Sequence, residues 1–128
     1  MTTTPLPDSA PTEEARKSFH EDLDELRVDV IRLAALTTEA IAGGTQALLD
    51  SDLNAAERVI EADDAMDELS KSLFRHILDS ERPDEESVLL AVQMALVARH
   101  YERIADHAVT IAERVGFMVT GEHPHHQG

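Results

Sequence analysis

Apolar side chains recur at alternating intervals of four and three residues along most of the chain. Such a row follows one face of an α-helix and is typical of helices that pack together along their length. In the first segment this row, which we call a seam, consists of Phe19, Leu23, Leu26, Val30, Leu33, Thr37, Ala40, Gly44 and Ala47. The pattern therefore predicts a long first helix that begins after Thr12 and ends near Asp50.

Two further segments carry seams of the same period. Over residues 53–80 the seam consists of Val59, Ala62, Met66, Leu69, Leu73 and His76. Over residues 84–121 it consists of Leu90, Met94, Val97, Tyr101, Ile104, Ala108, Ile111, Val115 and Met118. Pro83 separates the two segments, because proline disfavours helix at the residue before it. Asp84 suits the start of the last helix and Gly121 suits its end.

Helices joined by short connections run antiparallel to their neighbours. We therefore expect an all-α fold, an up-down-up antiparallel three-helix bundle over residues 13–121. The proline-rich residues 1–12 predict a disordered leader, and residues 122–128 predict a flexible tail that contains histidines. The tail histidines His123, His125 and His126 could bind Zn or Ni weakly, although a tail without function explains them more simply.

The pair Gly43 and Gly44 lies inside the first helical pattern. Glycine costs a helix about 1 kcal/mol relative to alanine, so two in succession need a compensating reason. We expect a close approach by another helix at this point. The same helix ends before Ser51 and Asp52, either of which suits the N-cap of the next helix.

The chain carries 26 acidic and 11 basic side chains, for a formal net charge of −15 over 128 residues. Nucleic-acid binding needs clustered Lys and Arg, so we expect no nucleic-acid partner, and metal cations or basic surfaces are favoured instead. Cysteine is absent, which excludes disulfides and thiolate metal sites. No apolar run approaches the ~20 residues that span a bilayer, and no signal peptide is recognisable, so we expect a cytoplasmic protein without membrane insertion.

Two acidic pairs with four-residue spacing are the candidate metal ligands. Asp63 and Asp67 lie in the second segment, and Glu102 and Asp106 lie in the third. Residues at i and i+4 share a helix face, where two carboxylates repel unless a cation lies between them. Two such pairs on adjacent helices could offer oxygen ligands to a hard cation or to Fe, Mn or Zn. If Tyr101 lies in the seam, the second pair points outward and the site is a surface platform.

Ordinary uses of these carboxylates compete with metal binding. An acidic chain contains such pairs by chance, and Arg99 or Arg103 could form surface ion pairs with Glu102. Asp63 and Asp67 interrupt a row with Ile60, Phe74 and Ile77, where a carboxylate costs burial energy unless another helix donates a hydrogen bond.

No catalytic arrangement stands out, so we expect a non-enzymatic protein. The histidines His76, His100 and His107 all lie in helical segments, and His76 falls on a seam position, where a core or edge histidine is the ordinary reading. Two alternatives remain open. One is a histidine phosphorelay module, for which the expected Lys and Gly beside the acceptor are missing. The other is a metal-free adaptor that dimerises through its aliphatic seams.

Three stretches of the chain carry motifs of one known protein family. Residues 19–23 read FHEDL, and residues 63–69 read DDAMDEL, which fits the pattern D-x-x-(I/M)-D-x-L. The most specific stretch is residues 101–108, YERIADHA, which are close to the signature ERIGDHA. In these stretches the chain resembles the PhoU-type regulators of phosphate transport and signalling, whose opening is similar to residues 19–23.

The resemblance implies a fold of three-helix repeats and a role in negative regulation of phosphate uptake and signalling. It implies that the acidic pairs are metal motifs on the helix surface, which by position are Asp63 with Asp67 and Glu102 with Asp106; the ion could be Fe, Mn, Zn or Mg. It also implies contacts with the phosphate ABC transporter or its sensor kinase, at the inner face of the membrane. Family members usually carry two repeats and this chain has room for one, so we expect a homodimer.

Overall fold

The described residues, 13–79 and 84–121 of the computed structural model, form three α-helices. These are α1 (Glu13–Asp50), α2 (Leu53–Asp79) and α3 (Glu85–Thr120). No strand occurs among these residues, which confirms the all-α prediction. The expected disordered leader at residues 1–12 and the histidine-containing tail at residues 122–128 lie outside the described part of the chain.

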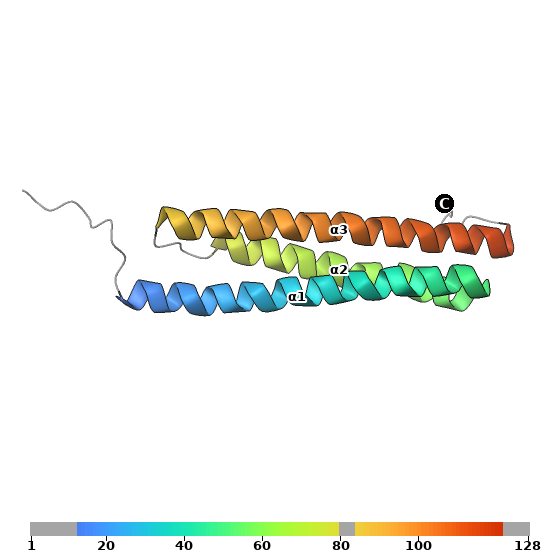
Figure 1. Ribbon diagram of the computed structural model, residues 1–128, viewed down its shortest axis with the longest axis horizontal. Helices are drawn as coiled ribbons and strands as arrows, with labels where there is room; N and C mark the ends of the chain where they lie inside the picture. Colours follow the sequence, from blue (N-terminus) through green and yellow to red (C-terminus); the bar gives the residue numbers. More distant parts are fainter. Residues whose placement is uncertain (1–12, 80–83, 122–128) are drawn as a thin grey trace, which may run out of the picture.

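The three helices lie side by side along most of their length, and each packs against the other two. In Figure 1 the colours show that α1 and α3 run in the same direction and that α2 runs against them. Because α2 runs against α1, the start of α1 lies near the end of α2. The middle of α2 lies beside the middle of α3.

The helix ends follow the predicted capping residues. The Asp52 carboxylate accepts a hydrogen bond of 3.1 Å from the Ala55 amide at the start of α2. The Asp84 carboxylate accepts one of 2.8 Å from the Ser87 amide, and the Ser87 side chain bonds back to Asp84, which completes a capping box. Gly121 ends α3 in the left-handed conformation, at φ 79°.

The core is narrow and built from aliphatic and small side chains. In α1 the predicted seam is confirmed from Leu23 onward, with buried side chains at Leu23, Leu26, Leu33, Thr37, Ala40 and Ala47 and a partly buried one at Val30. The side chain of Phe19, its predicted first member, lies outside the described part of the structure. The one polar member, Thr37, donates a hydrogen bond of 2.8 Å to the Leu33 carbonyl, so its hydroxyl is satisfied within its own helix. In α2 the buried side chains are Ala56, Val59, Met66, Ser70 and Leu73. The prediction that Ala62 belongs to this seam is wrong, since Ala62 is exposed.

The seam of α3 differs from the prediction at every second position. Leu90, Val97, Ile104 and Ile111 are 37% to 44% exposed, and Met118 is more exposed still. The residues that follow the first four are buried instead: Ala91, Ala98, Ala105 and Ala112. Each of these positions is an adjacent pair of apolar residues, and burying the smaller member lets the helix backbones approach. The larger member is left at the edge of the interface, where it forms part of an apolar surface row.

Both glycines of α1 lie where another helix passes close by, as the sequence predicts. A Cβ atom added to Gly43 would lie 2.9 Å from Val59 Cγ2 of α2. A Cβ added to Gly44 would lie 3.5 Å from both the Ala108 carbonyl oxygen and Ile111 Cγ2 of α3. The missing side chain is therefore needed at Gly43, against α2, whereas at Gly44 a methyl group would meet α3 at ordinary contact distances.

Candidate metal site

The four predicted metal ligands lie on two packed helices, with Asp63 and Asp67 on α2 and Glu102 and Asp106 on α3. Asp63, Asp67 and Glu102 are half-buried, while Asp106 is exposed. Buried neighbours such as Met66 and Ala105 hold the two helices together beneath them. The carboxylates thus lie above the α2–α3 interface rather than inside the core.

Electrostatics show that the two pairs act on each other. The pKa of Asp63 is raised, first by partial burial and then by the negative charge of Asp106 on the facing helix. Asp67, Asp64 and Glu102 raise the pKa further, in that order. Because the charges of Asp106 and Glu102 on α3 raise the pKa of Asp63 on α2, the two pairs form one acidic surface. The tertiary structure therefore brings the two sequence pairs to one region.

The four carboxylates are spread over this acidic surface rather than gathered at one point. Of the four described carboxylates, no three bring oxygen atoms within 4.8 Å of one another. Ions of the size of Mn²⁺ or Mg²⁺ bind oxygen at about 2.0–2.2 Å, so side-chain rotation would have to draw the oxygens together around them. Carboxylates this far apart could also be bridged by several ions, or by water molecules bound to an ion. The assignment of these four residues as metal ligands stays a prediction.

The surface ion pairs that compete for these carboxylates are few. Lys71 Nζ lies 3.3 Å from Asp67 Oδ2 on the same helix, and both side chains are about half exposed. Such a pair contributes little stability in water, so it offers weak competition to a divalent ion. Among the described residues, neither Arg99 nor Arg103 forms an ion pair with Glu102.

A second group of ligand-type side chains was not predicted. His76, from the last turn of α2, contacts the Asp22 carboxylate of α1 and lies 3.6 Å from Glu25 Oε1. The sequence held one local signal, because Asp22 and Glu25 share a helix face at a spacing of three residues. That α2 would bring a histidine to this face could only follow from the packing. By contrast, His100 and His107 are exposed on α3.

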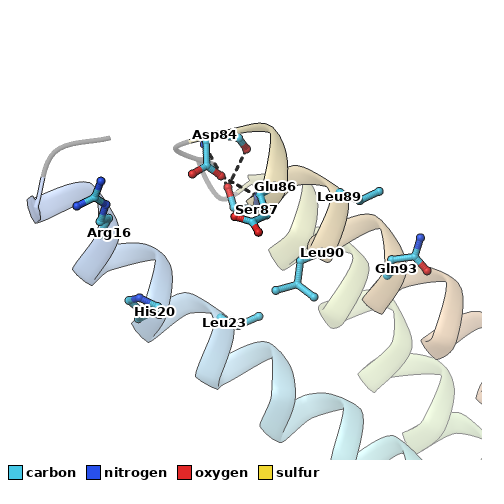
Figure 2. Close-up of a pocket in the computed structure, with 9 residues that line it drawn as sticks. All are labelled: Arg16, His20, Leu23, Asp84, Glu86, Ser87, Leu89, Leu90 and Gln93. Carbon is cyan, nitrogen blue, oxygen red and sulfur yellow. Dashed lines mark hydrogen bonds between the residues drawn. The ribbon is translucent and has the colours of Figure 1, made fainter. Parts of the chain in front are cut away.

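A separate pocket of about 520 Å³ lies between the first turns of α1 and α3. Figure 2 shows its lining residues, which include Arg16 and His20 on α1 and Leu89 and Leu90 on α3. Its polar groups on α3 include the capping box formed by Asp84 and Ser87. No three of its described His, Asp and Glu side chains bring ligand atoms within 4.8 Å of one another, so the pocket is a weaker candidate for a metal site.

Among the described helices, none combines the length and the apolar character needed to cross a membrane.

Comparison with known proteins shows a family match over the central part of the bundle. The profile of the PhoU domain matches residues 30–115. A relative from Mycobacterium leprae, named phosphate-specific transport system accessory protein PhoU homolog 1, is 36% identical over 115 residues, which cover 90% of this chain and 51% of the relative. PhoU homolog 2 of Mycobacterium tuberculosis is 43% identical over 79 residues, or 62% of this chain and 36% of the relative.

PhoU homolog 1 of Methanothermobacter thermautotrophicus is 32% identical over 96 residues, or 75% of this chain and 44% of the relative. No solved structure matches the chain significantly. The chain spans about half the length of the first curated relative it matches. Since the profile covers two acidic pairs and parts of all three helices, the chain belongs to the PhoU domain family.

Proposed function

We propose that this protein is a non-catalytic accessory regulator of phosphate uptake and phosphate-dependent signalling. The relatives are named accessory proteins of a phosphate-specific transport system, and an accessory role supports regulation of transport rather than an enzymatic reaction. In this proposal the bundle binds cations on its α2–α3 surface and contacts the phosphate ABC transporter or its sensor kinase at the cytoplasmic face of the membrane. Negative regulation of uptake is the expected direction.

The observation that carries the metal part is the raised pKa of Asp63. Carboxylates that lie close enough to destabilise each other's charge are stabilised by a dication placed among them. Oxygen-only ligands suit Mg²⁺ or Mn²⁺, and Fe or Zn remain compatible where several carboxylates share ions. The site then serves as a charged docking surface whose sign depends on its metal load.

The apolar row at the α1–α3 edge supports homodimer formation. Between these helices lies a cavity of about 410 Å³, lined in part by Ile31, Leu90, Met94 and Val97. Ile31, which is 67% exposed, extends the apolar lining of this cavity onto the surface, and a contiguous apolar surface of this kind is typical of an interaction site. A second copy would bring the assembly to about the length of the Mycobacterium leprae relative, of which this chain matches about half.

Metal titration of the purified protein tests the proposal. After removal of metal with a chelator, Mn²⁺, Fe²⁺, Zn²⁺ and Mg²⁺ are added separately, and thermal unfolding and bound metal are measured. At least one ion should raise the melting temperature of the wild type, and Asp63→Asn or Asp106→Asn should greatly reduce that rise. Glu57→Gln, an exposed carboxylate elsewhere on α2, is the matched control and should respond like the wild type.

The regulatory part is tested in a bacterial host whose own gene for this protein is deleted. Expression of phosphate-uptake genes in high phosphate should increase on deletion and return to its repressed level with the wild-type gene. An unchanged phosphate response after deletion would contradict the assignment to this pathway.

A metal-free adaptor is the second candidate, favoured by the exposed apolar row. Under that alternative, Asp67→Ala and Asp106→Ala leave repression unchanged, whereas a substitution at Ile31 disrupts it. The phosphorelay alternative is tested by incubation with a phosphodonor, with His107→Ala as the control. Absence of an acid-labile label removes that reading.

A further inference from the structure

The cluster of Asp22, Glu25 and His76 joins the first half of α1 to the last turn of α2. His76 Nε2 contacts Asp22 Oδ1 and lies 3.6 Å from Glu25 Oε1. One ligand-type atom from each residue lies within 4.8 Å of the other two, and residues 13–79 and 84–121 contain no other such set of three. The donors are therefore already gathered, unlike those of the α2–α3 acidic surface.

Burial gives the three side chains different freedom. Asp22 is 16% exposed and His76 is 24% exposed, so the packing of α1 against α2 holds both in place. Glu25 is 71% exposed and can move toward or away from them. Two fixed donors and one mobile donor allow an ion to enter from solvent and then be enclosed.

Charge favours a dication over a proton at this point. A protonated imidazole carries one positive charge, which faces two carboxylates and leaves the cluster net negative. A divalent ion bound by neutral His76 and both carboxylates balances the charge completely. One imidazole nitrogen with two carboxylate oxygens is a donor set that suits Zn²⁺ and other divalent transition metals.

There is also room for the remaining coordination positions. A surface cavity of about 390 Å³ borders the cluster, lined by Glu25, His76, Asp24, Val28, Asp29 and Arg32. Arg32, which lines this cavity, lies 3.6 Å from Asp29 and is thereby directed to another carboxylate. Water can occupy the fourth coordination position of an ion that is held by three protein ligands.

We propose that Asp22, Glu25 and His76 form a binding site for one divalent transition metal ion, best matched by Zn²⁺. The site is separate from the α2–α3 carboxylates and stands whether or not those bind metal. A bound ion ties α1 to α2 at the end of the bundle where α1 begins. Its occupancy therefore adjusts how firmly that end is held together.

Zinc binding by the full-length protein tests the site. All variants carry His123→Ala, His125→Ala and His126→Ala, so that the tail cannot contribute imidazoles. Isothermal titration with Zn²⁺ at pH 7.5 should show one equivalent that disappears, or weakens at least tenfold, in His76→Gln. Glu25→Gln keeps the Asp22–His76 contact and should also weaken that equivalent. His107→Gln, an exposed histidine on α3, is the matched control and should bind like the parent.

Glu25→Gln decides the matter if His76→Gln folds poorly, because Glu25 is exposed and contributes little to packing. A second readout is the ¹⁵N NMR signal of the His76 ring, which should shift on addition of one equivalent of Zn²⁺. Equal zinc affinity in the parent and Glu25→Gln, together with an unmoved His76 signal, overturns the proposal and leaves the cluster as an ion pair only.

Discussion

Single residues of this bundle carry electrostatic and polar costs that the fold tolerates. Asp63 is held where burial and neighbouring carboxylates both oppose its charge. Ser70 is buried, and its hydroxyl oxygen has no hydrogen-bond partner within the described part of the chain. Costs of this kind are common at functional positions, where a ligand or partner offsets them. Each of the two residues leads to a test on the metal-free protein.

Neutralising Asp63 should stabilise the protein when metal is absent. Because its folded-state pKa is raised, the folded state holds the proton more tightly than the unfolded chain does. Stability from this group is full below the unfolded pKa of about 3.8 and falls as pH rises through the folded-state pKa. Asp63→Asn should remove that fall and raise the melting temperature at pH 7, measured by circular dichroism with chelator present.

With saturating metal the wild type should have the higher melting temperature of the two, because only the wild type is stabilised by the bound ion. A lower melting temperature for Asp63→Asn than for the wild type in chelator, at pH 7, would contradict the raised pKa.

Removing the buried hydroxyl of Ser70 should also be stabilising. A buried polar group without a partner costs roughly 1–3 kcal/mol, so Ser70→Ala should raise the free energy of unfolding by about 1 kcal/mol. Ser72→Ala, at an exposed position of α2, shares the gain in helix propensity and serves as the control. Urea denaturation measures both. A gain for Ser70→Ala no larger than that for Ser72→Ala would mean that the hydroxyl is satisfied.

At the scale of the helix, small residues at the contacts let the helix backbones pack closely, and large side chains contribute less to these contacts. Gly43 admits Val59 of α2, and Gly44 admits the backbone of α3 at Ala108. The buried alanines of α3 serve the same purpose on the opposite helix. The close approach explains why the large aliphatic residues of α3 end at the edge of the interface.

The two glycines should respond differently to alanine. At Gly44 the added methyl group meets ordinary contact distances of 3.5 Å, so Gly44→Ala should gain about 1 kcal/mol from helix propensity. At Gly43 it would lie 2.9 Å from a methyl group of a short, branched side chain. Gly43→Ala should therefore lose that gain to strain and be less stable than Gly44→Ala in urea denaturation. Shortening the neighbour, in Gly43→Ala with Val59→Ala, should relieve the strain although it forfeits some buried apolar surface.

For the whole molecule, a net charge of −15 and an apolar edge act in opposite directions on association. The charge keeps copies apart at low ionic strength, whereas the apolar row between α1 and α3 favours contact. Dimerisation should therefore strengthen as salt is added. Divalent ions should strengthen it further, because they neutralise carboxylates directly.

Ile31→Glu tests the proposed dimer surface, because it places a charge in the α1–α3 cavity at an exposed position. Analytical ultracentrifugation in 0.3 M salt should show a dimer for the wild type and a tenfold or greater rise in its dissociation constant for the variant. Leu78→Glu, at an exposed leucine on α2, is the control and should dimerise normally. A wild-type monomer at all concentrations would exclude this surface as a self-association site.

Local information settled the number of helices, their ends and the seam of α1. These features depend on periodicity and capping residues, such as Asp84 and Gly121, which act on their immediate neighbours. The family resemblance could likewise be read from continuous stretches of the chain.

The tertiary structure decided which member of each adjacent apolar pair in α3 faces inward, because that choice depends on how closely the helices approach. It also placed Asp63 opposite Asp106, and His76 against Asp22, which lies 54 residues away in the sequence. Contacts between distant residues depend on the rotation and offset of whole helices, and a period of three and four leaves both undetermined.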